Sequence, residues 1–142
     1  MKKTILTGAS VLALAIAAPA LAQSNQSTVT QTGSGQSADV TQSGANDLST
    51  VTQSNADNEA EVVQAGVLGG TSDIVQSGTD NFASVSQSDD GDVVIPGSVP
   101  PSSISTVDQT GNGNSATVAQ TTQSQVFANE SDIDQLGNNN IA

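Results

Sequence analysis

The sequence has no cysteine, histidine, tryptophan or tyrosine, and its only two basic residues, Lys2 and Lys3, stand at the very start. Without imidazole or thiol side chains, the usual nucleophile–base pairs and soft metal sites are excluded. Because no lysine or arginine follows Lys3, the chain has no cations with which to neutralise a phosphate backbone, so we expect no nucleic-acid partner. We also expect neither enzyme activity nor a bound cofactor.

The charge that remains is acidic. All 14 carboxylates lie after residue 22, so residues 23–142 carry a formal charge of −14, compared with −12 for the whole chain. This part is also poor in large apolar residues, since Val, Ile, Leu and Phe supply 24 of its 120 residues. Such a composition is typical of disordered chains. The order of the residues predicts a regular structure instead.

Residues 1–22 have the organisation of a secretory signal peptide. Two lysines precede an apolar stretch at residues 11–18, and the Ala-Leu-Ala sequence at residues 20–22 forms a small-x-small cleavage site. The apolar stretch is shorter than the roughly 18 residues that a membrane span needs. We therefore expect cleavage, export through the periplasm and a secreted chain of residues 23–142 without a transmembrane segment.

Glutamine recurs along this chain with a period of about eleven residues. The successive spacings are 11, 11, 11, 12, 11, 22, 11 and 15. A β-branched residue stands two positions before each glutamine, and Ser or Ala, in strict alternation, stands four positions before it. The glutamines are Gln31, Gln42, Gln53, Gln64, Gln76, Gln87, Gln109, Gln120 and Gln135. The β-branched residues are Val29, Val40, Val51, Val62, Ile74, Val85, Val107, Val118 and Ile133.

This pattern predicts an all-β solenoid. The small, β-branched and glutamine residues lie two apart, so all three point to one face of a strand. The Ser/Ala alternation makes the unit a pair of strands of about 22 residues, giving four full coils and a truncated fifth. Parallel strands linked by short Gly/Asn-rich turns cannot form hairpins. They can form a solenoid, in which each coil stacks on its neighbours. Like positions then repeat about 4.8 Å apart, and we expect the glutamines to form structural amide ladders above a thin β-branched core.

The 22-residue spacing marks an insertion, because the Ser/Ala alternation continues across it. Residues 88–102 contain three prolines, which cannot lie inside a ladder of paired strands. We therefore expect residues 23–142 to form one repeat domain with a surface loop at about residues 88–102.

One stretch of the repeat resembles a known family. It reads Ser103-x5-Gln109-x-Gly111-x-Gly113-Asn114-x-Ala116-x3-Gln120. This is similar to the repeat of curlins, the subunits of curli, the extracellular amyloid fibres of Gram-negative bacteria. The resemblance implies a β-solenoid that polymerises with itself into a cross-β fibre on the cell surface. It also implies a nucleator subunit and an outer-membrane secretion channel as partners, and a role in biofilm matrix and adhesion.

Three other motifs have simpler interpretations. Residues 33–38 and 111–116 fit a G-x-G-x-x-A dinucleotide fingerprint, but no helix is expected after them, so we interpret both as turns. The acidic residues 89–92 resemble part of a calcium loop but lack its later ligands, which favours a solvated loop and leaves weak divalent binding open. Thr-x-Thr at 28–30 and 50–52 resembles the rows of ice-binding solenoids, but acidic residues interrupt these rows in later repeats.

The main alternative is a monomeric solenoid adhesin or surface protein. A monomeric solenoid needs capping segments that cover its terminal coils. Here the repeat begins close to Gln23 and stops in the middle of a coil at Ala142. This arrangement favours a fibre subunit.

Overall fold

The computed structural model describes residues 24–66, 69–89, 103–122 and 128–142. The expected signal peptide, residues 1–22, lies outside the described residues, as do residues 90–102 of the expected insertion. The strands are β1 (Gln26–Ser34), β2 (Ser37–Gly44), β3 (Leu48–Ala56), β4 (Glu59–Gly66), β5 (Gly70–Thr79), β6 (Phe82–Asp89), β7 (Ser103–Asn112), β8 (Ser115–Thr122) and β9 (Glu130–Leu136). The first two residues of the expected insertion, Ser88 and Asp89, still belong to β6.

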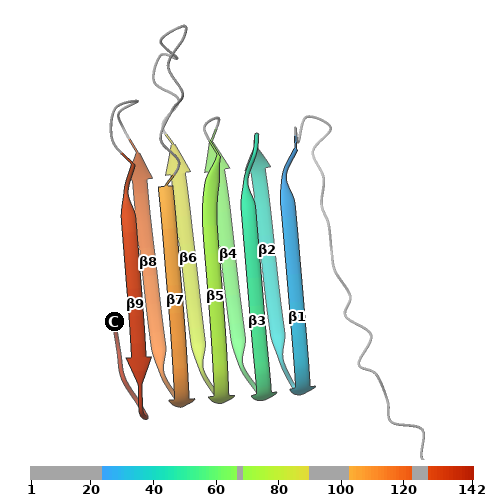
Figure 1. The fold of residues 1–142 in the computed structure, drawn as a ribbon, viewed down its shortest axis with the longest axis vertical. Coiled ribbons are helices and arrows are strands. Elements are labelled where there is room, and N and C mark those ends of the chain that lie inside the picture. Colours follow the sequence, from blue (N-terminus) through green and yellow to red (C-terminus); the bar gives the residue numbers. More distant parts are fainter. Residues whose placement is uncertain (1–23, 67–68, 90–102, 123–127) are drawn as a thin grey trace, which may run out of the picture.

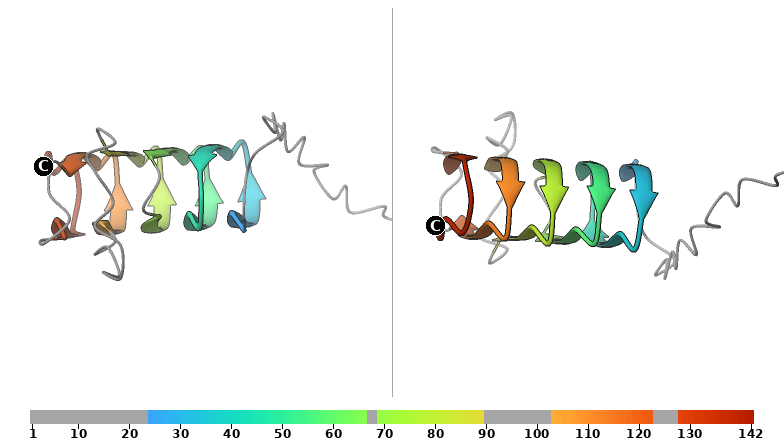
Figure 2. Two further views of the ribbon diagram at one scale, coloured as in Figure 1. Left: turned by 90° about the horizontal axis from the view of Figure 1, so that it is seen from above. Right: turned by 90° about the horizontal axis from the view of Figure 1, so that it is seen from below.

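The strands form two parallel sheets that face each other. One sheet has the order β1-β3-β5-β7-β9 and the other the order β2-β4-β6-β8. Figure 1 shows the odd-numbered strands running opposite to the even-numbered ones, and Figure 2 shows the two layers from their ends. The Ser-type repeats make the first sheet and the Ala-type repeats the second. The prediction of an all-β solenoid with two strands in each coil is confirmed.

The register keeps like residues together along the stack. In all seven strand pairs a glutamine lies opposite a glutamine, and a β-branched residue lies opposite a β-branched residue. A one-residue slip would turn every inward side chain outward, so the inward-facing pattern fixes this register. After β9, a single parallel bridge between Ile141 and Ser115 begins the second strand of a fifth coil.

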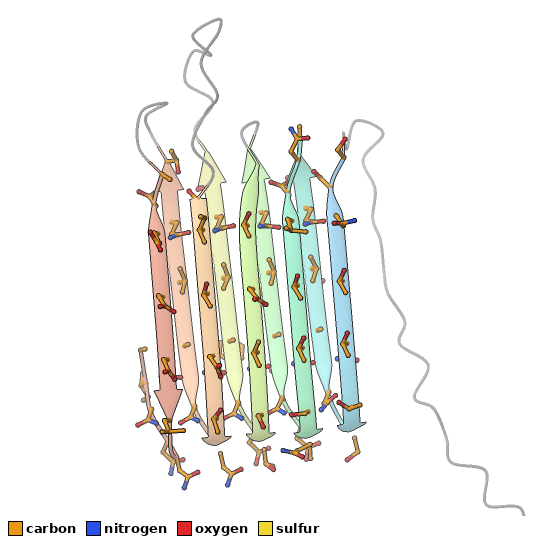
Figure 3. All side chains as sticks on the ribbon, viewed as in Figure 1. Atoms are coloured by element: carbon orange, nitrogen blue, oxygen red, sulfur yellow. The ribbon has the colours of Figure 1, made fainter. Side chains whose placement is uncertain are left out.

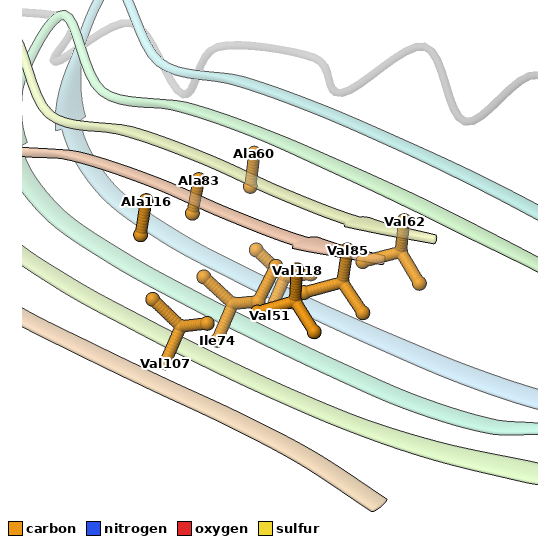
Figure 4. Close-up of a cluster of buried hydrophobic side chains, with 9 residues drawn as sticks. All are labelled: Val51, Ala60, Val62, Ile74, Ala83, Val85, Val107, Ala116 and Val118. Atoms are coloured by element: carbon orange, nitrogen blue, oxygen red, sulfur yellow. The ribbon is translucent and has the colours of Figure 1, made fainter. Parts of the chain in front are cut away.

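Each sheet contributes a single layer of inward side chains to the core between them. Nine apolar side chains are buried between the two sheets, and Figure 4 shows them as sticks between the ribbons. These are Val51, Ala60, Val62, Ile74, Ala83, Val85, Val107, Ala116 and Val118. The predicted core residues of the outer coils, Val29, Val40 and Ile133, are partly buried and pack against this cluster.

Tight corners join each odd-numbered strand to the even-numbered strand that follows it. Only two residues separate the strands there, as between Asn112 and Ser115. Two positions after the glutamine, Gly111 has a φ of 121°, and a Cβ added to it would lie 1.9 Å from the carbonyl oxygen of Gly137. Close stacking of the coils at this corner therefore requires glycine at position 111.

Replacing Gly111 with Ala should destabilise the solenoid by about 3 kcal/mol, because the methyl group meets a backbone carbonyl and the residue is held at positive φ. Gly137→Ala is the matched control: its φ is 107°, but the nearest atom to its added Cβ is 3.7 Å away. The free energy of unfolding would be measured by denaturant titration followed by circular dichroism. Equal losses in the two variants would contradict the steric argument.

Candidate functional site

The inward glutamines form two continuous ladders of side-chain amides. In the first sheet each Nε2 donates to the Oε1 of the next coil, with N···O distances of 2.7–2.9 Å, through Gln31, Gln53, Gln76, Gln109 and Gln135. In the second sheet the same bond, 2.9 Å at each step, links Gln42, Gln64, Gln87 and Gln120. All nine glutamines singled out in the sequence lie in these two ladders.

Each ladder also ties the two sheets together. Gln76 Nε2 donates its second hydrogen to the backbone carbonyl of Glu59 in the facing sheet, at 2.9 Å. Gln64 makes the equivalent bond to Leu48 at 3.1 Å, and the other ladder members after Gln31 do the same. A buried amide normally costs free energy unless its donors and acceptor are paired. Here both donors of an interior glutamine are used, one along the stack and one across it.

A third ladder, of asparagines, runs along the tight corner. Asn58 Oδ1 accepts from the backbone N–H of Asn81 at 3.0 Å, and the same contact links Asn81 to Asn114 and Asn114 to Asn140. The side-chain nitrogens of the first three donate to the carbonyl of a glycine in the next coil at 2.8–2.9 Å. This ladder was not among the features expected from the sequence. Its signal is the constant five-residue step from glutamine to asparagine.

The two ends of the first glutamine ladder carry opposite hydrogen-bonding groups. At the β1 end, Gln31 Oε1 accepts no hydrogen bond from the described residues. At the β9 end, Gln135 Nε2 donates to Ser115 O at 3.0 Å, which leaves its second N–H unpaired among the described residues. The ladder therefore has a direction, with a free acceptor at one end and a free donor at the other.

The outward faces of the sheets bring like charges together. Asp39 lies directly opposite Glu61, and Asp108 lies directly opposite Asp134. Figure 3 shows how side chains at equivalent positions repeat in rows across the strands. Opposed like charges on neighbouring strands are destabilising, so the acidic surface works against stacking.

The geometry offers a scaffold and shows no metal centre in the described part of the chain. Among residues 24–66, 69–89, 103–122 and 128–142, no three or more acidic side chains are grouped so that they could hold a metal ion. Those residues also include no helix long and apolar enough to cross a bilayer. No protein-family model, curated protein or solved structure matches the chain.

Replacing Gln76 with Leu should cost about 2–4 kcal/mol of unfolding free energy, because it leaves a donor of Gln53 and the Oε1 of Gln109 buried without their partner. Gln36→Leu is the control, since Gln36 lies outside the two glutamine ladders and makes a single side-chain bond, to Thr32 O at 3.0 Å. Both variants would be compared by urea unfolding. A loss at Gln36 as large as that at Gln76 would argue against the ladder as the main source of stability.

Replacing Asp39 with Asn should stabilise the solenoid by roughly 0.5–1 kcal/mol at low ionic strength, because it removes a like charge opposite Glu61. The gain should shrink at 0.5 M NaCl, where charges are screened. Asp73→Asn is the matched control, since Asp73 lies between Thr50 and Thr106. Unfolding would be measured at both salt concentrations. A gain at Asp39 that does not depend on salt would exclude charge repulsion as its cause.

Proposed function

We propose that this protein is the structural subunit of an extracellular, curli-like amyloid fibre in which copies of the solenoid stack end to end. The observation that carries the proposal is the pairing of the edge strands. Within the described residues, β1 pairs only with β3 and β9 only with β7. An edge strand with unpaired backbone groups is a template for another strand.

The polarity of the glutamine ladder supports stacking in one direction. If β1 of a second copy pairs with β9 in the same register, the free Oε1 of Gln31 faces the free N–H of Gln135. The amide ladder then continues through the junction with the geometry that it has inside each copy. Stacking of two identical ends would instead bring acceptor to acceptor or donor to donor. Head-to-tail stacking also allows unlimited growth, because a contact between unlike surfaces does not close.

The other parts of the proposal rest on the sequence. The N-terminal pattern of a signal peptide supports export, and the resemblance to curlins supports a cell-surface fibre in biofilm matrix and adhesion. A nucleator subunit and an outer-membrane secretion channel are the partners that this resemblance proposes. The acidic, lysine-free exported chain favours a bulk subunit that binds its own kind.

The direct test is whether purified residues 23–142 assemble. We expect fibres that bind thioflavin T and diffract at about 4.8 Å along the axis and about 10 Å between sheets. Assembly should be seeded by preformed fibres of the same chain. A folded protein that stays monomeric at high concentration would favour the monomeric solenoid adhesin instead.

The variant Gln135→Glu tests the direction of growth. It replaces the whole Nε2 group with a carboxylate oxygen, which removes the donor to Ser115 O and would face the Oε1 of Gln31. Seeded elongation should therefore slow at least about tenfold. Ser86→Glu adds the same charge on the outward face of an interior coil, opposite Val63 and Ala119, and should elongate close to the wild-type rate. Rates would be followed by thioflavin fluorescence at fixed seed concentration. Equal slowing in the two variants would mean that net charge, and not the ladder end, limits growth.

A further inference from the structure

Asp47 occupies a position at which the neighbouring coil has an amide. One coil below it, Asn25 Oδ1 accepts from the backbone N–H of Asp47 at 2.9 Å, and Asn25 Nδ2 lies 3.4 Å from the carbonyl oxygen of Gly44. Asp47 repeats the first contact, since its Oδ1 accepts from the backbone N–H of Gly70 at 2.9 Å. The second contact cannot be repeated in the same form, because the second terminal atom of Asp47 is an oxygen.

The asparagine ladder at the other corner shows which group bonds best at this side-chain position. There the second terminal atom of the side chain is an N–H donor, and it meets a glycine carbonyl of the next coil, as Asn58 meets Gly78 at 2.9 Å. The equivalent carbonyl for Asp47 belongs to Gly66, which pairs in register with Gly44. An ionised carboxylate would present oxygen to oxygen at this point.

The Asp47 carboxylate is buried and accepts only one direct hydrogen bond from the described residues. The residue is 3% exposed, and its Oδ2 is buried with no hydrogen-bond partner in the part of the chain that is described. Gly70 has no side chain, so Asp47 and Gly66 line a cavity of about 20 Å³, enough for one water molecule. On its far side, Ser103 and Thr122 bond to each other through their hydroxyls at 2.7 Å.

No basic side chain is available to neutralise Asp47. Residues 24–142 contain no lysine, arginine or histidine. Apart from Asp47, the residues that line the cavity, from the β4–β5 corner and from strands β4, β5, β6, β7 and β8, have no titratable side chains. Asp89, at the end of β6, is an acidic residue that pairs in register with the lining residue Thr122.

We propose that Asp47 is a buried proton-binding site, at which the protonated carboxyl donates its O–H to the Gly66 carbonyl and holds the second and third coils together. A proton fits better than a metal ion. Calcium takes six to eight oxygen ligands, whereas this one-water cavity offers a single carboxylate. Burial raises the pKa of Asp47, while the hydrogen bond from the Gly70 amide lowers it. Burial is the larger effect.

The proton makes the stability of the Asp47–Gly66 contact depend on pH in a defined direction. The folded-state pKa is raised above the unfolded value of about 3.9. The stability that the proton supplies is therefore complete below that value and is lost as the pH rises through the folded-state pKa. Asp47→Asn supplies a permanent N–H donor in place of the proton, so it should make the contact independent of pH.

The first experiment measures the proton directly. The full chain, labelled with ¹³C at the aspartate carboxyls, would be titrated by NMR, and Asp47 would be assigned by the resonance missing in Asp47→Asn. We expect the pKa of the Asp47 carboxyl to lie above the usual aspartate range, in wild type and in Asp89→Asn. Titration of Asp47 together with the exposed carboxyls would overturn the proposal. The proposal would also be overturned if the pKa of Asp47 in Asp89→Asn lay in the usual aspartate range, or if the Asp47 resonance shifted on addition of 1 mM calcium.

The second experiment measures the consequence for stability. Compared with wild type, Asp47→Asn should raise the thermal midpoint by about 4 °C at pH 7.5 and leave it unchanged near pH 3.5. The reciprocal variant Asn58→Asp should lower the midpoint at pH 7.5 and recover towards pH 3.5, because it places the same acid opposite the Gly78 carbonyl. Asp73→Asn, on the outward face, is the control for loss of charge. A gain in Asp47→Asn that is the same at both pH values would contradict the proton site.

Discussion

The structure depends on one side chain that bonds in two directions. The amide of an interior glutamine donates once along the stack to the next glutamine and once across it to the facing sheet, as Gln76 does to Gln109 and to Glu59. The first bond requires a neighbouring coil in register, and the second requires the other sheet at a fixed distance. Because a buried amide without partners is costly, each coil is stable only beside another coil. The same requirement leaves unpaired amide groups at the two ends of the first ladder, which is the basis of the stacking that we propose.

The crossing bond also explains the order small, β-branched, glutamine. The two sheets run in opposite directions, so a glutamine near the end of one strand reaches the beginning of the facing strand. Gln76 bonds to the carbonyl of Glu59, immediately before Ala60, and Gln64 bonds to that of Leu48, immediately before Ser49. The long side chain thus crosses where the facing side chain is small, and the β-branched residues meet each other in the middle. This pairing fills a thin core at nearly constant volume, which the low apolar content could not do by large side chains.

Much of this architecture could be predicted from the sequence, because period and alternation determine which residues share a face and a column. The crossing bond could not, since the distance and direction of the facing sheet are not encoded in the periodicity of one strand. The asparagine ladder was missed although the step from Gln76 to Asn81 recurs, because asparagine was interpreted, together with glycine, only as a turn residue. Asp47 was missed because its column varies from coil to coil. The choice of Ser over Ala in the first sheet stays unexplained by hydrogen bonding: Ser49, Ser72 and Ser105 bury hydroxyls without partners among the described residues.

The two corners of each coil differ in how much variation they accept. From a Ser-type to the next Ala-type glutamine the spacing is 11 residues in every coil, whereas from an Ala-type to the next Ser-type glutamine it is 11, 12, 22 and 15. The constant corner holds the asparagine ladder and glycines such as Gly111, whose contacts fix the backbone of each coil against the next. At the variable corner the corresponding column passes through Asn25, Asp47, Gly70 and Ser103. The bond from a side-chain Oδ1 to the next backbone N–H occurs at the first two steps and ends at Gly70, which has no side chain. Longer connections cost little entropy where both sheets stay in register. Chain-specific features can therefore accumulate along one side of the stack, where they leave the ladders intact.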